Sequence, residues 1–250
     1  MLPVLNVGSV ALQTRGLVLL AAFWFGLYAT DRAARRLNLD PDDFWNAGFM
    51  ALLAGIFSAR TAYAIRFWDV YAHSPRLLVS PNIRDMDWRV GALVGALVFV
   101  VWLIRMRVPL RRAADALVVG GAVAWALAGL SAFLSGDAFG TPTRLPWGVV
   151  LWGVKRHPVQ LYESVAGVAI AAILWAWLPR RRFDGWLALV GVALLAGARM
   201  LIETFRATQT VLPGGFRAVQ FAAWLILLAA LALLAMLDRP ESHQSSNSGK

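Results

Sequence analysis

The sequence predicts an all-α membrane protein, a bundle of about seven transmembrane helices with a polar site on the extracytoplasmic side. The first observation is composition: 59% of the 250 residues are hydrophobic, 15% are charged, and the mean hydropathy is +0.62, whereas soluble domains carry more charge. The second is that the apolar residues gather in runs long enough to cross a bilayer, which takes about 20 residues. The third is that Arg residues cluster in the short connections between these runs.

The apolar runs define seven predicted spans, and we expect each to end where charged, Gly- or Pro-containing sequence begins. The third is short, so we expect it to be tilted or extended by its flanks. The N-terminal sequence has no basic region and no small-residue cleavage site before its apolar run, so we expect the first span to be retained. The predicted spans cover residues 9–30, 44–66, 90–104, 113–134, 161–178, 185–205 and 216–237.

No internal repeat is evident, so we expect one membrane domain over residues 1–238. Small residues such as Gly91, Gly95, Gly120 and Gly121 are expected to let helices approach closely within it. The remaining residues, 239–250, read RPESHQSSNSGK. This polar, low-complexity sequence is expected to be a disordered cytoplasmic tail.

The orientation follows from the distribution of basic residues. The longer connections, about 67–89, 135–160 and 206–215, hold fewer basic residues for their length. By the positive-inside rule the Arg-rich short connections face the cytoplasm. We therefore expect the N-terminus and the long connections outside and the C-terminus inside. The short connections are predicted to contain Arg32, Arg35, Arg36, Arg105, Arg107, Arg111, Arg112, Arg180, Arg181 and Arg182.

Composition also excludes several function classes. The net charge is +10, but its clustering between apolar runs is typical of cytoplasmic loops, so no nucleic-acid partner is expected. The chain has no Cys, which excludes disulfides, thiolate metal sites and a cysteine nucleophile. Its three histidines, His73, His157 and His243, are too few to favour a His-based metal centre. We expect no metal and no cofactor.

The predicted functional centre is the stretch from Gly136 to Glu163, GDAFGTPTRLPWGVVLWGVKRHPVQLYE. Irregular backbone beside a span needs polar partners that lipid does not supply, so such a stretch typically lines a site or a cavity. It lies between two strongly apolar runs. Its polar side chains include Asp137, Lys155, Arg156, His157, Gln160, Tyr162 and Glu163.

Charged residues within the apolar runs are the second group of candidates, because a charge at bilayer depth costs on the order of 3 kcal/mol. Arg199, Glu203 and Arg206 are spaced so that they share one helix face and can form a ladder. We expect this ladder and the Gly136–Glu163 stretch to converge near the outer face, where Arg suits a lipid phosphate. The alternative is that Glu203 merely neutralises its neighbours. The full group is Arg60, Asp115, Asp137, Glu163, Arg199, Glu203 and Arg206.

Individual residues of these groups have structural alternatives. An imidazole at His157 is suited to proton transfer near neutral pH, but with Pro158 it can equally form the start of a helix. Glu163, near the start of the same predicted helix, would stabilise the helix dipole without any chemistry. Arg60 can reach an anion or pair with Asp137.

The motifs resemble those of the prolipoprotein diacylglyceryl transferase family over nearly the whole chain. GDAFGTPTRLPWGV, RHPVQLYE and RMLIETFR occur in the family's order and spacing, followed by Gly214, Gly215 and Gln220. LDPDDF at 39–44 and SARTAY at 58–63 resemble further family segments. The resemblance implies a multi-pass enzyme of the bacterial cytoplasmic membrane that moves a diacylglyceryl group from phosphatidylglycerol to the lipobox cysteine of a prolipoprotein signal peptide, releasing glycerol phosphate.

The resemblance also implies site residues. Asp137 stands where the family has Glu, Gly140 and Arg199 match positions associated with substrate binding and activity, and Glu203 and Arg206 complete an Arg-x-x-x-Glu-x-x-Arg pattern. Arg199 and Arg206 would stabilise the departing phosphate. We predict catalytic roles for Arg199, His157, Asp137 and Glu163, and head-group binding by Arg206, Glu203, Arg60, Gly140 and Tyr162.

Several family positions carry other residues. Val90 stands in place of the His proposed as base, and Leu195 replaces an expected Tyr. Gly129 and Ala132 replace an Arg and an Asn of the family's Gly-Arg-x-x-Asn-Phe motif. The first hypothesis is therefore a divergent diacylglyceryl transferase, with His157 as substitute acid or base. The second is a non-catalytic lipid-binding homologue. A small-solute transporter is less favoured, since no paired repeats are evident.

Overall fold

The computed structural model describes residues 4–7, 10–79, 85–208, 215 and 217–238. Within these ranges, seven helices are long and apolar enough to cross a membrane, which confirms the predicted seven-span all-α membrane protein. The predicted tail, residues 239–250, lies outside the described residues. The seven helices are α1 (Thr14–Arg36), α2 (Pro41–Arg66), α4 (Trp88–Arg105), α5 (Leu110–Ser135), α6 (Val159–Trp177), α7 (Trp186–Glu203) and α8 (Ala218–Leu237).

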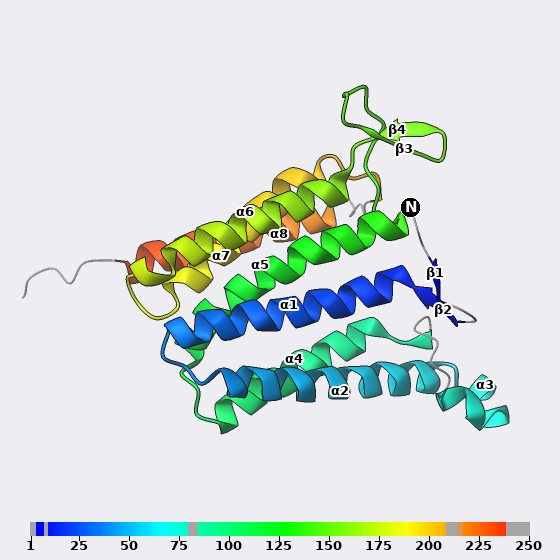
Figure 1. Cartoon of the computed structure of the whole chain (residues 1–250), viewed down its shortest axis with the longest axis horizontal. Helices are drawn as coiled ribbons and strands as arrows, with labels where there is room; N and C mark the ends of the chain where they lie inside the picture. Colours follow the sequence, from blue (N-terminus) through cyan, green and yellow to red (C-terminus); the bar gives the residue numbers. More distant parts are fainter. Residues whose placement is uncertain (1–3, 8–9, 80–84, 209–214, 216, 239–250) are drawn as a thin grey trace, which may run out of the picture.

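The seven helices run side by side, with α2 and α4 on one side of α1 and α5 to α8 on the other (Figure 1). Helix α1 packs along α5, α2 along α4, α5 along α6, and α7 along α8. The short connections lie at one end of the bundle and the longer segments at the other, as Figure 1 shows.

The smaller elements lie at the long-segment end, except η3. Strand β1 (Val4–Val7) pairs antiparallel with β2 (Val10–Gln13), and β3 (Val149–Leu151) with β4 (Val154–Arg156). The other short elements are α3 (Trp68–His73) and the 3-10 helices η1 (Pro75–Val79) and η3 (Leu178–Arg180).

The first span differs most from its prediction. It begins at Thr14 rather than at residue 9, because residues 10–13 form strand β2, and it continues to Arg36 rather than to residue 30. The basic residues predicted in the following connection therefore lie in the helix. Their side chains are held by neighbours: Arg35 Nε lies 2.6 Å from Asp31 Oδ1, and the Arg36 guanidinium lies 4.0 Å from the ring centre of Trp175.

Arginines at the short connection between α4 and α5 also belong to helices. Arg105 ends α4, and Arg111 and Arg112 lie in the first turn of α5. Long Arg side chains carry their charge beyond the helix end while the backbone stays helical, so a basic residue does not end a span. The third span, predicted to be short, is extended by its flanks to Trp88–Arg105.

The buried Asp115 joins two of the spans at the short-connection end. Its carboxylate accepts hydrogen bonds from the backbone N–H groups of Gly185 and Ala188, both at 2.8 Å. These groups lie at the N-cap and in the first turn of α7, where free N–H groups favour a carboxylate. Asp115 therefore caps α7 from α5, and its place in an apolar run is explained by structure.

Close helix contacts occur at three of the four glycines predicted to allow them. A Cβ atom added to Gly91 of α4 would lie 2.7 Å from the carbonyl oxygen of Gly55 and 2.8 Å from the Cβ of Ala59, both in α2. Gly95 and Gly120 are similarly crowded by backbone carbonyls, whereas a Cβ at Gly121 meets no atom within 4 Å among the described residues. Because Gly91 and Gly95 have no side chains, α2 and α4 can pack this closely.

We predict that Gly91→Val destabilises the protein by about 1–3 kcal/mol, because the added side chain would force the two helices apart. Gly121→Val is the matched control, since it makes the same change in a membrane helix where space is open. The measurement is the midpoint of thermal unfolding in detergent. Equal midpoints for the two variants would contradict the close contact.

Candidate active site

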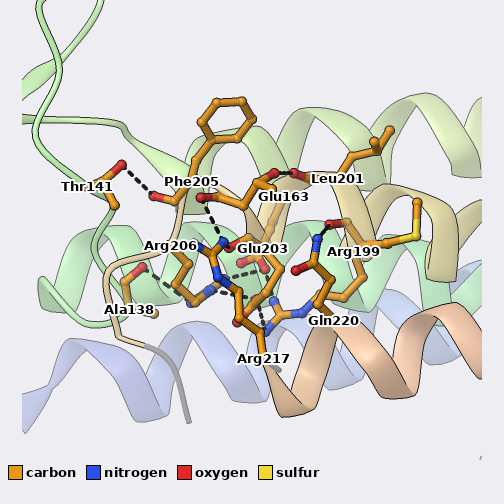
Figure 2. Close-up of polar contacts among 12 residues, drawn as sticks. Ala138, Thr141, Glu163, Arg199, Leu201, Glu203, Phe205, Arg206, Arg217 and Gln220 are labelled. Atoms are coloured by element: carbon orange, nitrogen blue, oxygen red, sulfur yellow. Dashed lines mark hydrogen bonds and ion pairs between the residues drawn. The ribbon is translucent and has the colours of Figure 1, made fainter. Parts of the chain in front are cut away.

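Four charged side chains form a buried cluster at the long-segment end of α6 and α7 (Figure 2). Arg206 Nη2 lies 2.5 Å from Glu163 Oε1, and Arg206 Nε lies 3.1 Å from Glu203 Oε2. Arg199 Nη2 lies 3.1 Å from Glu203 Oε2, and its Nη1 contacts Glu163 Oε1. We call these four residues the Arg–Glu quartet. It contains the Arg199–Glu203 pair expected from helical spacing. Arg206 also pairs with Glu203, but from beyond the end of α7 at Glu203 rather than from the same helix face, and it joins the pair to Glu163 of the predicted centre.

The quartet balances two guanidinium groups against two carboxylates. Glu163, Glu203 and Arg206 are 5%, 1% and 6% exposed, and charges buried to this extent must be paired. Arg206 uses Nη1 as well, donating to the carbonyl oxygen of Ala138 at 3.3 Å. The Arg199 side chain remains 29% exposed. Arg206 is thus enclosed by its partners, whereas Arg199 is the member with an open side.

The segment from Asp137 to Gly140 is held against the quartet by its backbone. Each of its four carbonyl oxygens accepts a hydrogen bond, and two of the donors are side chains of residues that the sequence placed in the centre. Such a fully bonded segment satisfies the backbone of an irregular stretch at the end of a span. The donors, in order, are Gln160 Nε2 at 2.6 Å, Arg206 Nη1 at 3.3 Å, the backbone N–H of Ala207 at 3.0 Å, and Arg156 Nη1 at 3.3 Å.

Gly140 is required by this packing. A Cβ atom there would lie 2.3 Å from the carbonyl oxygen of His157 and 2.7 Å from Cγ2 of Val159. Residue 140 also forms an antiparallel bridge with Arg206. Gly140 therefore lies beside the site. Because it has no side chain, the backbones of Arg206 and His157 can both approach the strand-like segment that contains it.

The carboxylate of Asp137 is held by a residue that sequence reasoning missed. Arg15, in the first turn of α1, places Nη1 2.7 Å from Asp137 Oδ2, and the same oxygen accepts from Ser135 Oγ at 2.9 Å. Arg15 and Asp137 are 122 positions apart in the sequence. Helical spacing relates only residues a few positions apart, so it does not predict this contact. The available signal was that Arg15 is a lone Arg at the start of a span whose other basic residues gather at its end.

His157 and Tyr162 lie together in an aromatic group beside the quartet. His157 Nδ1 is 3.2 Å from the Tyr162 hydroxyl, which also accepts a hydrogen bond from Trp147 Nε1 at 2.9 Å. The imidazole ring centre is 4.9 Å from that of Phe205. Phe205 directly precedes Arg206 and Tyr162 directly precedes Glu163, so the chain itself connects this group to the quartet.

Arg60 lies apart from these residues. It extends from α2, where its Nη1 donates to the carbonyl of Asp85 at 2.9 Å and its Nε to that of Leu78 at 3.1 Å. Nη1 also lies 3.7 Å from the Asp85 carboxylate. The expected alternative partner, Asp137, is paired with Arg15 instead, because α1 lies between α2 and α5 (Figure 1). Arg60 thus holds Leu78 and Asp85, in the described parts of the connection between α2 and α4.

Two of the divergent positions have structural explanations. A Cβ at Gly129 of α5 would lie 2.7 Å from the carbonyl oxygen of Gln160 and 2.8 Å from Ser164 Oγ in α6. An Arg side chain there requires α5 and α6 to separate. Val90 lies in the first turn of α4, which packs on α2 away from the quartet. No base is expected from that position.

A groove between α7 and α8 lies next to the quartet. It has a volume of about 280 Å³, and its walls are mostly apolar. At its polar end Arg217 Nη1 donates to the carbonyl oxygens of Glu203 and Thr204, at 3.2 and 3.1 Å. Figure 2 shows Arg217 and Gln220 beside the quartet. The lining residues are Met200, Leu201, Thr204, Arg217, Gln220, Phe221 and Trp224.

The fold and the site define a polytopic membrane protein with a polar, charge-balanced site held between its spans at one end of the bundle. Among the described residues no three His, Asp or Glu side chains are grouped to hold a metal ion. Residues 3–236 match the prolipoprotein diacylglyceryl transferase family. The chain belongs to that family, which confirms the resemblance and indicates a multi-pass protein of the bacterial inner membrane.

Three curated relatives are similar to most of the chain, and each is named phosphatidylglycerol–prolipoprotein diacylglyceryl transferase. The one from Clostridioides difficile (strain 630) is 24% identical over 92% of this chain and 93% of its own. Those from Finegoldia magna and Geobacter sulfurreducens are 26% and 29% identical, over 87% and 94% of this chain and 88% and 94% of their own. All three relatives are named as enzymes, which does not favour the hypothesis of a non-catalytic lipid-binding homologue.

We predict that Glu163→Gln destabilises the protein by about 3–5 kcal/mol, because it leaves Arg199 and Arg206 without one of their two carboxylates in a buried place. Asp137→Asn is the matched control: the Asp137 side chain is 49% exposed, so its loss of charge is expected to cost less than about 1 kcal/mol. Thermal unfolding in detergent measures both. A larger loss for Asp137→Asn than for Glu163→Gln would show that the quartet is not the stabilising contact.

Proposed function

We propose that this chain transfers a diacylglyceryl group from phosphatidylglycerol to the lipobox cysteine of a prolipoprotein. The thiolate sulfur bonds to the terminal glyceryl carbon, the bond from that carbon to the phosphate oxygen breaks, and glycerol phosphate leaves with the electron pair. The thiol proton passes to a base. Membership of the family supports the reaction. The observation that supports this site as the place of the reaction is the Arg–Glu quartet, in which Arg199 is open on one side.

Arg199 is the residue we propose to stabilise the departing phosphate. A guanidinium has five N–H donors, and the described contacts of the Arg199 side chain are those with Glu163 and Glu203. The open side therefore retains donors for a phosphate oxygen. Glu163, Glu203 and Arg206 hold Arg199 in place, so the site is preorganised for negative charge that develops as the bond breaks. In this proposal Arg206 acts through Arg199 and the Asp137–Gly140 segment.

His157 is the proposed base. When Nδ1 donates to the Tyr162 hydroxyl, Nε2 is left to accept the thiol proton. Tyr162 and Phe205 then fix the ring orientation, which general base catalysis requires. The alternative remains that His157 only positions the chain before α6, since its backbone N–H also donates to the Thr141 carbonyl at 3.0 Å.

We also propose the predicted orientation, in which the long segments and the N-terminus face outward. The Arg-rich connections at the opposite end support it through the positive-inside rule. The quartet then lies near the outer surface of the membrane, where phosphatidylglycerol in the bilayer and the signal peptide of a prolipoprotein would meet. Residues 239–250 form a cytoplasmic tail in this orientation, after a single membrane domain over residues 1–238.

We predict that the native chain restores lipidation of a reporter lipoprotein in bacteria depleted of their own diacylglyceryl transferase, and that Arg199→Ala does not. Loss of this positive charge is expected to lower transfer by about 100-fold or more. The measurement is the mobility shift of the reporter. Arg89→Ala, which removes an exposed Arg at the same end, is the control and should restore lipidation. Full activity of Arg199→Ala in membranes would refute its role.

We predict that His157→Ala lowers transfer by about 100-fold or more at neutral pH. If His157 is the base, the variant depends on thiolate already present in the substrate. A free Cys has a pKa of about 8.5, so the variant's rate should rise about tenfold per pH unit below that value, whereas the native rate should rise less. Parallel pH profiles for the two proteins, measured with purified protein, would assign His157 a structural role.

A further inference from the structure

We propose that Arg15 is a lipid-binding residue of the site: its guanidinium, held by Asp137, binds the phosphate of the phosphatidylglycerol head group. This inference rests on the proposed function for the identity of the lipid. It concerns the first turn of α1, which neither the motifs nor the quartet include. The geometry that points to it is the contact of 2.7 Å between Arg15 Nη1 and Asp137 Oδ2.

Arg15 is fixed at both its backbone and its head. The hydroxyl of Ser131, which is 1% exposed, donates to the carbonyl oxygen of Arg15 at 3.1 Å. This bond ties the start of α1 to α5 in the interior, about two turns before Asp137. The guanidinium then meets Asp137, which Ser135 also holds. A long, flexible side chain is thereby directed toward one place before any ligand binds, which lowers the entropy lost on binding.

Stability does not explain the Arg15–Asp137 pair. The two side chains are 60% and 49% exposed, and pairs exposed to this extent contribute about 0–1 kcal/mol. Among the described residues the Arg15 side chain has this contact alone, so most of its five donors have no partner among those residues. An Arg that is anchored, oriented and still open is suited to an anion that arrives from outside the protein.

The ligand chemistry follows from where the pair lies. The carbonyl of Asp137 is held by Gln160, and the carbonyl of the next residue by Arg206 of the quartet. Arg15 is therefore connected through Asp137 to the same short segment that contacts the quartet. The anion available at the end of a membrane span is a lipid phosphate. Arg15 and Arg199 are then two cationic groups on separate helices that hold one head group.

Position 129 of α5, where the family has an Arg, is a Gly in this chain. Gly129 lies against α6, where an added Cβ would be 2.7 Å from the Gln160 carbonyl oxygen. An Arg at residue 129 would separate α5, which leads into Asp137, from α6, which carries Glu163. Placing the cation at the start of α1 leaves the contact between α5 and α6 intact.

The test measures KM for phosphatidylglycerol and kcat with purified protein, phosphatidylglycerol in mixed micelles and a lipobox peptide. Loss of one charge-assisted contact is expected to raise KM by about 10- to 100-fold in Arg15→Ala, with kcat and the unfolding midpoint nearly unchanged. Arg15→Lys should recover part of the affinity, because it keeps the charge without the fork. Arg89→Ala, which removes an exposed Arg from the same end, is the control and should match native KM.

A double variant tests whether Asp137 affects lipid binding only by holding Arg15. If Asp137 acts by holding Arg15, Arg15→Ala/Asp137→Ala should have the same KM as Arg15→Ala. A KM in Arg15→Ala within twofold of native or equal to that of Arg89→Ala would overturn the proposal. So would a fall in kcat and in the unfolding midpoint with KM unchanged, since that result describes a structural contact.

A binding arm separates this inference from the proposed function. Binding of short-chain phosphatidylglycerol and of phosphatidylcholine to the native chain, Arg15→Ala and Arg89→Ala is followed by tryptophan fluorescence. Weaker phosphatidylglycerol binding in Arg15→Ala alone supports the inference even when the native chain transfers nothing, in which case only the proposed function fails. Equal binding by all three proteins overturns the inference even when transfer is observed.

Discussion

The pairing of two buried carboxylates with two guanidinium groups is the constraint on which the site depends. Glu163 and Glu203 are almost fully enclosed, and neither can be charged there without a cation. Arg206 satisfies both, and to do so the chain after α7 must turn back beside α6. That turn brings residues 205–207 against residues 138–141, where backbone bonds continue the contact. The quartet thus fixes an irregular segment as well as two helices.

This arrangement suits chemistry at the edge of a membrane. Irregular backbone is tolerated there only when its polar groups have partners, and the four carbonyls of Asp137–Gly140 all have them. A rigid segment in turn holds the Asp137 carboxylate and, through it, Arg15. The result is a set of cations whose positions are set before substrate binds, which is the main source of electrostatic stabilisation in enzymes. The groove at Arg217 provides an apolar surface beside them.

Much of this was predictable from sequence, for identifiable reasons. The spans follow from hydrophobic length, and the Arg199–Glu203 pair from helical spacing, because both are local properties. Arg206 was expected on the same helix face but lies after the end of α7, where the chain turns back. Convergence of that ladder with Glu163 was predicted from the shared end of the bundle. The first helix was misplaced because strand pairing of residues 10–13 competes with an apolar run, and Arg15 was missed because its contact with Asp137 crosses 122 positions. Arg60 was grouped with the site because it is a charge within an apolar run, and that pattern alone does not identify its partner, which is Asp85.

The most direct test of the account is a mass balance on the reaction itself. Purified native chain is incubated with phosphatidylglycerol and a lipobox peptide, and mass spectrometry follows both products over time. The account predicts that the peptide gains one diacylglyceryl group on its cysteine and that glycerol phosphate appears in equal amount. Glycerol phosphate without modified peptide, or neither product from folded protein that binds phosphatidylglycerol, would contradict transfer at this site.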